Sequence, residues 1–135
     1  MPTTRTTEEK SAVPAAQTAA VLYVCAERSP TAPGLAAERA EREGRAFARA
    51  HDLALVETVT DPYGEPDPMQ REGWRRVREL AAASEIGMVI IRWPATLAPE
   101  ANHELRYREV NALAEHGVTV RYSWAPLASD SGGLR

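Results

Sequence analysis

The sequence has few cysteines, few lysines and no long apolar run, and each shortage excludes a class of protein. Cys25 is the only cysteine, so the chain cannot form an internal disulfide. Nothing in the composition therefore favours an oxidising compartment. No run of about 18 apolar residues is present, which argues against a transmembrane helix. The first residues also lack the basic start and apolar stretch of a secretory signal. We expect a cytoplasmic protein that does not enter a membrane.

Basic residues are not in excess. Sixteen Lys and Arg residues oppose 19 Asp and Glu residues, the net charge is −3, and Lys10 is the only lysine. Proteins that bind nucleic acid usually carry a basic excess or a concentrated basic patch. The composition therefore predicts weak DNA binding at most. A nucleic-acid-binding module is still an alternative, and it would use a short cluster of arginines: Arg71, Arg75, Arg76 and Arg78.

Several motifs of cofactor, metal and nucleophile chemistry are absent. The sequence contains neither GxGxxG nor GxxxxGK[ST], the glycine-rich loops that hold phosphate groups. A C-x5-R loop starting at Cys25 would need arginine where Thr31 stands, and HExxH starting at His103 would need histidine at Tyr107. We predict no cofactor and no metal. The three histidines are interpreted as surface residues at helix ends: His51, His103 and His116.

The length and composition predict one domain. The chain has 135 residues, of which 44% are hydrophobic and 26% are charged, and these are ordinary values for a globular protein. Residues 1–18 and 125–135 show no clear hydrophobic period, so they are interpreted as a flexible leader and a flexible tail. Residues 19–124 form the predicted domain.

Within that domain, two kinds of hydrophobic pattern alternate. Continuous apolar runs at residues 19–25 and 86–91 predict strands that are buried on both faces. Gly44 interrupts one predicted helix at a cost of about 1 kcal/mol relative to alanine. The remaining elements are predicted as strands at 53–59 and 118–122 and as helices at 35–51, around 74–81 and at 99–116.

This alternation predicts an α/β fold. Strands separated by helices form right-handed βαβ units, which give a mainly parallel sheet of four or more strands with helices on both faces. Functional residues in such sheets normally follow the carboxyl ends of the strands. Glu27 and Asp61 are carboxylates at such positions. An unrelated small α/β enzyme that uses Glu27 or Asp61 for acid/base catalysis is therefore a second alternative.

Five segments, taken in order, resemble the catalytic domain of resolvase/invertase-type serine recombinases. The resemblance extends from about Val21 to Tyr122 and implies a three-layer α/β/α fold. The segments are the Val21–Glu27 strand, Asp61 with Gly64, Gln70–Trp74, the Ile86–Ile91 strand followed by Leu97–Ala98, and Gly117–Tyr122.

The resemblance implies a catalytic motif Y-x-R-x-S at the end of the first strand. In the family, its serine attacks a DNA phosphate and becomes covalently linked to it. Tyr23 matches the tyrosine of this motif, but Cys25 stands at the arginine position and Glu27 at the serine position. Ser29, two residues further on, is the candidate for a displaced nucleophile.

The second family segment, D-R-L-x-R, departs in the same way. Ala95 stands at its aspartate position, and Thr96 and Pro99 stand at its two arginine positions. Family arginines stabilise the negative transition state, and a neutral residue fills that role poorly. Arg71 is the remaining candidate phosphate ligand, and we assign no catalytic residue.

We therefore predict a resolvase-like domain that acts without catalysis, as a regulatory or protein-association module. The simplest partner is a second copy of the chain, and a DNA-recombining relative of the family is the other alternative. We also expect Glu27 and Arg71 to pair. Aromatic residues near the strand ends favour a protein interface, and these are Trp93, Tyr122 and Trp124.

Overall fold

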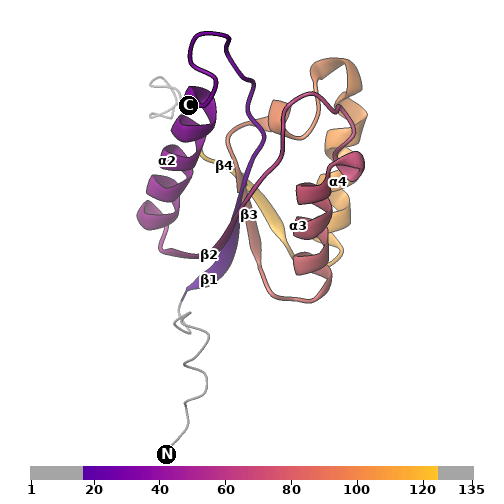
Figure 1. Ribbon diagram of the computed structural model, residues 1–135. Coiled ribbons are helices and arrows are strands. Elements are labelled where there is room, and N and C mark those ends of the chain that lie inside the picture. The colour runs from indigo at the N-terminus through magenta and orange to yellow at the C-terminus, as the bar shows by residue number, and fades with distance from the viewer. Residues whose placement is uncertain (1–16, 125–135) are drawn as a thin grey trace, which may run out of the picture.

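The computed structural model describes residues 17–124 (Figure 1). The predicted tail and all but two residues of the predicted leader lie outside these residues. The first strand begins at Thr18, so the last residue of the predicted leader already belongs to the sheet. No helix in the described part of the chain is long and apolar enough to cross a membrane.

Four parallel strands form one sheet. They are β1 (Thr18–Val24), β2 (Leu53–Thr60), β3 (Met88–Ile91) and β4 (Thr119–Tyr122). Their order in the sheet is β2-β1-β3-β4, and all three neighbouring pairs are parallel. This arrangement confirms the predicted fold class. It also brings the segments that follow β1, β2 and β3 to one edge of the sheet.

Helices cover both faces of this sheet. Helix α2 (Leu35–Ala50) covers one face, and α3 (Glu72–Ala82) and α4 (His103–Ala114) cover the other (Figure 1). The helix predicted at residues 99–116 is shorter than expected. A 3-10 turn at Glu100–Asn102 comes first, and the non-helical backbone of Asn102 (φ −121°, ψ 37°) separates it from α4. After α4, Gly117 adopts a φ of +77°, which suits a residue that ends a helix.

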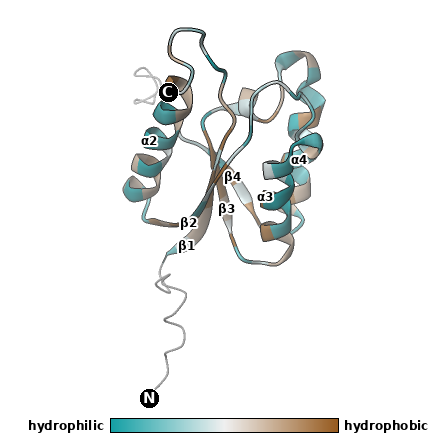
Figure 2. Cartoon of the chain, viewed as in Figure 1, coloured by the Kyte–Doolittle hydropathy of each residue, from teal (hydrophilic) through white to brown (hydrophobic). Residues whose placement is uncertain are grey.

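The side chains of β1 alternate between two cores. Val21 and Tyr23 pack with residues of α3 and α4, whereas Leu22 and Val24 pack with residues of α2. No residue from Ala20 to Val24 is more than 2% exposed, and Val89–Ile91 are fully buried. The prediction that the first and third strands are the most buried is therefore confirmed. Figure 2 shows the same division, with apolar strands between helices whose outer faces are hydrophilic.

Gly44 lets α2 approach the sheet closely. A Cβ atom at this position would lie 2.3 Å from Leu22 Cδ1 and 2.8 Å from Leu22 Cδ2. Both residues are buried. Besides its cost in helix propensity, Gly44 therefore has a packing role, because its missing side chain makes room for Leu22.

We predict that Gly44→Ala destabilises the protein by about 1–3 kcal/mol, the usual cost of overpacking a core. The loss should appear although alanine favours an isolated helix by about 1 kcal/mol. Urea denaturation measures the free energy of unfolding. The matched control is Ala46→Gly at an exposed position of α2, which should cost only about 1 kcal/mol through helix propensity. A stabilised Gly44→Ala variant would contradict the close contact.

Candidate functional site

A cavity of about 660 Å³ lies at the carboxyl ends of β1, β2 and β3. Its walls come from the loops that follow these strands and from the start of α2. The family-site positions identified in the sequence all line this one cavity, although they come from three separate segments: Tyr23, Cys25, Glu27, Arg71, Ala95, Thr96 and Pro99. The strand ends are therefore hollow and not a smooth surface.

Asp61 lies beneath the cavity and joins three elements. Its main-chain N–H donates to Val24 O at 2.9 Å, which extends the pairing of β1 and β2 by one residue. Its carboxylate accepts hydrogen bonds from Tyr23 Oη at 2.6 Å, Gly73 N at 2.7 Å and Trp74 N at 2.9 Å. The last two donors are N–H groups in the first turn of α3, which have no acceptor within the helix. Asp61 therefore caps α3 from another strand, where a negative charge is favourable.

Gly73 is needed for this cap. A Cβ atom on Gly73 would lie 2.8 Å from both carboxylate oxygens of Asp61. The carboxylate can therefore reach the main chain of α3 only because residue 73 has no side chain. The sequence showed Asp61 and Gly73 as parts of the family resemblance, but it did not show that they touch.

Arg71 is buried, and its side chain donates hydrogen bonds to main-chain carbonyls. Its Nε donates to Glu65 O, its Nη1 to Thr96 O and its Nη2 to Leu97 O, each at 2.9 Å. Nη1 also lies 3.4 Å from the Tyr23 hydroxyl oxygen. The guanidinium thus ties the loop after β2 to the loop after β3. These carbonyls take three of the five N–H donors of the guanidinium.

Glu27 is exposed at the cavity wall and does not pair with Arg71. Among the described residues, no ion pair and no hydrogen bond involves the Glu27 carboxylate. The predicted Glu27–Arg71 pair is therefore wrong, and the cause is that backbone carbonyls satisfy the arginine instead. Arg71 is only 7% exposed, whereas Glu27 stays in contact with solvent.

Ser29 does not line the cavity. Its Oγ lies 3.1 Å from Thr31 Oγ1 and accepts hydrogen bonds from the main-chain N–H groups of Thr31 and Ala32. These contacts order the loop between β1 and α2. The displaced nucleophile considered from the sequence therefore has a local structural role here.

Cys25 is a buried thiol at the end of β1. It is 8% exposed, packs in the core beside α3, and donates a weak hydrogen bond to Pro62 O at 3.6 Å. Burial raises the pKa of this thiol. A raised pKa lowers the fraction of reactive thiolate. Cys25 therefore packs as a small buried side chain of the core.

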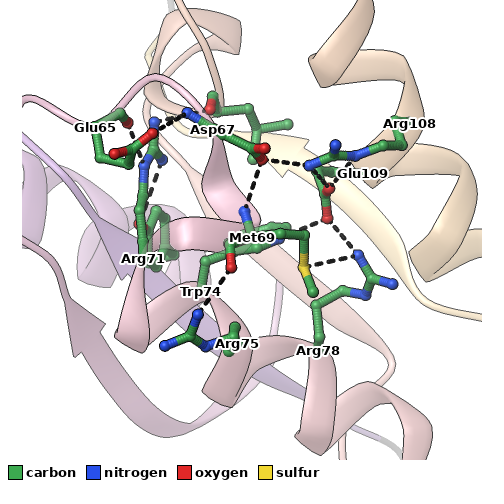
Figure 3. Close-up of polar contacts among 11 residues, drawn as sticks. Glu65, Asp67, Met69, Arg71, Trp74, Arg75, Arg78, Arg108 and Glu109 are labelled. Carbon is green, nitrogen blue, oxygen red and sulfur yellow. Dashed lines mark hydrogen bonds and ion pairs between the residues drawn. The ribbon is translucent and has the colours of Figure 1, made fainter.

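A buried glutamate of α4, Glu109, connects this helix to α3 on the face of the sheet that both helices cover (Figure 3). Glu109 is fully buried and accepts hydrogen bonds from Trp74 Nε1 at 2.8 Å and from Arg108 Nε at 2.7 Å. Arg78 pairs with the same carboxylate. Arg108 also pairs with Asp67, and this hydrogen bond lowers the pKa of Asp67. Three donor side chains thus compensate the cost of burying the charge of Glu109.

The sequence analysis missed Glu109, although a signal was present. Glu109 lies four residues after Leu105 and four before Leu113, so all three fall on one face of α4. Leu113 is fully buried and Leu105 is partly buried. An acid between two apolar residues at this spacing indicates a buried carboxylate that needs basic partners.

The arginine cluster of α3 is engaged within the domain. Arg76 forms an ion pair with Glu57 of β2, with 3.0 Å between Nη2 and Oε1. Arg75 donates to Met69 O at 3.0 Å, and Arg78 pairs with Glu109. These contacts reduce the positive charge that the cluster offers to a phosphate group.

The described residues contain no group of three or more His, Cys, Asp or Glu side chains that could hold a metal ion. The three histidines lie apart, at the ends of two helices. His51 follows α2, His103 begins α4, and His116 lies just beyond the end of α4.

The buried tyrosine predicts how stability depends on pH. Burial and the hydrogen bond to Asp61 raise the pKa of Tyr23 far above its ordinary value near 10. Above about pH 10, the unfolded chain therefore loses a proton that the folded protein keeps, and stability falls as pH rises. We expect the stability advantage of the wild type over Tyr23→Phe to shrink by about 1.4 kcal/mol per pH unit above about pH 10.

Urea denaturation at several values between about pH 8 and pH 11 measures this difference. Tyr107→Phe is the control, because the side chain of Tyr107 is 65% exposed. Its profile should run parallel to that of the wild type. A parallel profile for Tyr23→Phe as well would contradict the buried Tyr23–Asp61 contact.

No protein-family model and no curated protein sequence matches this chain. Its structure is nevertheless similar to solved structures. The C-terminal catalytic domain of ISC1926 TnpA, an IS607-like serine recombinase, is 18% identical with a TM-score of 0.65, over 84% of this chain and 72% of that chain. A resolvase family site-specific recombinase from Streptococcus pneumoniae is 18% identical with a TM-score of 0.63, over 79% of this chain and 72% of that chain.

The N-terminal catalytic domain of TP901-1 integrase is a further similar structure. It is 13% identical with a TM-score of 0.61, over 78% of this chain and 76% of that chain. The likeness lies in the three-dimensional arrangement, since the sequences share less than a fifth of their residues in each case. The chain therefore has the fold of a serine recombinase catalytic domain.

Proposed function

We propose that this domain uses the serine recombinase fold without its chemistry and acts by associating with protein. One observation carries the proposal. In the cavity where the family positions meet, a solvent-exposed carboxylate, Glu27, stands at the serine position, while the guanidinium of Arg71 is held by three backbone carbonyls.

The chemistry of DNA cleavage explains why this arrangement opposes catalysis. A nucleophile must attack phosphorus, and positive groups must stabilise the charge that develops on the phosphate oxygens. Glu27 carries a negative charge, and the neighbouring family positions Cys25, Thr96 and Pro99 carry no charge that could bind phosphate. Removing one transition-state donor typically costs about 10²–10³ in rate. The loss of several, together with the nucleophile, leaves no useful activity.

One observation supports the alternative of a small α/β enzyme, and another opposes it. A cavity at the strand ends is the usual place for a ligand in such folds. Asp61, however, does not line it and has three hydrogen-bond donors on its carboxylate. Of the two carboxylates proposed for acid/base work, only Glu27 contacts the cavity. We therefore favour binding over acid/base catalysis.

Protein association is supported by aromatic residues beside the cavity. Trp93 and Trp124 contact each other with 5.2 Å between ring centroids, and they are 38% and 43% exposed. Tyr122, at the end of the edge strand β4, is also exposed. Exposed aromatic residues are enriched at protein interfaces. A second copy of this chain is the simplest partner that could cover them.

The absence of DNA chemistry can be tested with a supercoiled plasmid. We expect neither nicking nor a covalent protein–DNA adduct on a denaturing gel, for the wild type and for Glu27→Ser alike. The serine variant should stay inactive because Cys25, Thr96 and Pro99 still lack the phosphate-binding charge. An adduct that disappears in Ser29→Ala would show a working displaced nucleophile and overturn the proposal.

Self-association can be tested by light scattering over a range of protein concentrations. We expect a dimer that Trp124→Ala weakens about tenfold or more, as for a central aromatic residue of an interface. Val56→Ala is the matched control, because Val56 is an exposed apolar residue of β2 at the opposite edge of the sheet. A strict monomer at every concentration, or an equal effect of both substitutions, would count against this interface.

A further inference from the structure

We propose that the strand-end cavity binds an organic cation, namely a protonated amine attached to an apolar group. The inference rests on the proposed non-catalytic use of this cavity and names the ligand that it would take.

The cavity has the size of a small-molecule site. Its volume of about 660 Å³ lies within the range of roughly 300–1,000 Å³ that is typical of ligand pockets. Most of its lining surface is apolar, and the side chains of Ala36, Ala40, Pro66 and Pro99 contribute to it. Such walls can bury a ring or a short alkyl chain, and burial of apolar surface is the main source of affinity in pockets of this kind.

The arginines of the cavity already have partners within the domain. Arg71 donates to three backbone carbonyls, and its positive charge lies near the buried Asp61 carboxylate across the Tyr23 hydroxyl. Arg92 forms an ion pair with Glu43 of α2, with 3.0 Å between Nε and Oε1. Most N–H donors of Arg71 are therefore occupied, and the charge of Arg92 is paired.

The carboxylates of the cavity are less completely neutralised. Glu100 pairs with Arg106. Glu65 accepts a hydrogen bond from the main-chain N–H of Asp67, and it has no ion pair among the residues that the structure describes. Glu27 has neither a hydrogen bond nor an ion pair in the same part of the chain. Two negative charges thus face the cavity without a cationic partner, and this sign of charge attracts an ammonium group and repels phosphate.

The rim adds aromatic rings, which favour the same ligand. The guanidinium carbon of Arg92 lies 4.5 Å from the ring centroid of Trp93, so this ring already stacks with one cation. Tyr63 also lines the cavity and is 55% exposed. The face of an aromatic ring attracts cations through its quadrupole. A ligand that places its ammonium near Glu27 and Glu65 could therefore also contact Tyr63.

Three small probes of similar size but different charge test this inference. They are 2-phenylethylamine, which is protonated at pH 7, the neutral 2-phenylethanol and the anionic 3-phenylpropionate. Each is titrated into the full-length chain, and binding is followed by the backbone amide signals of residues 25–27, 63–66 and 93–96. We expect saturable shifts with the amine, binding at least about fivefold weaker with the alcohol, and weaker still with the carboxylate.

Substitution of the exposed carboxylate makes the test specific. Glu27→Gln keeps the shape of the side chain, and it should weaken amine binding about three- to tenfold without changing the binding of the alcohol. Glu85→Gln is the matched control, because Glu85 is exposed at the other end of the sheet, ahead of β3, and does not line the cavity. It should leave the affinity unchanged. The amide spectrum of each variant verifies that it is folded.

Several outcomes would overturn the inference. They are equal affinity for the three probes, tighter binding of the carboxylate, no saturable shift with the amine at millimolar concentration, and an unchanged amine affinity in Glu27→Gln. None of these titration results would be evidence for DNA cleavage. A protein–DNA adduct would contradict the proposed function whatever the titration shows. The failure of one proposal is therefore distinguishable from the failure of the other.

Discussion

The carboxylate of Asp61 is the contact on which the rest of the site depends. Asp61 directly follows the end of β2. Its carboxylate accepts a hydrogen bond from the hydroxyl of Tyr23 in β1 and caps the first turn of α3. Once α3 starts at that point, Arg71 stands directly before it and reaches the carbonyls of two loops. The position of the cavity wall therefore follows from one buried charge and its donors. A buried charge of this kind is tolerated because its hydrogen bonds replace the water that it lost.

In this arrangement, the residues that hold the strand ends together differ from the exposed residues of the cavity. Tyr23, Asp61, Arg71 and Gly73 hold the strand ends and α3 together, and their roles need neither DNA nor a nucleophile. Of the residues that differ from the family motif, Glu27, Ala95 and Pro99 are exposed at the cavity, where a substitution does not disturb the core, whereas Cys25 and Thr96 are buried. Glu27 is the clearest example, since it is exposed and makes no contact that the fold requires. Exposed positions at the strand ends can therefore differ without a change of fold.

The fold was largely predictable from the sequence, whereas the contacts of the site were not. Continuous apolar runs identified β1 and β3, because strands that are buried on both faces leave that pattern. The non-helical backbone of Asn102 sets the start of α4, and the helical pattern did not reveal it. Gly44 and Glu109 depend on partners far away in the sequence, namely Leu22 in one case and Trp74 and Arg78 in the other. A hydrophobic period records which face of an element is buried, but it does not record which atoms meet there.

Backbone carbonyls hold the guanidinium of Arg71, and we expect that it does not serve as a phosphate ligand. The most direct test is to follow the Nε–H signal of Arg71 by nitrogen-15 NMR while inorganic phosphate, and then a short DNA duplex, is added. We expect the Arg71 Nε–H to exchange slowly with water, because its hydrogen bond to Glu65 O protects it. The chemical shift of this Nε–H should not move with either addition. A saturable shift of this signal, or rapid exchange with water in the free protein, would contradict it.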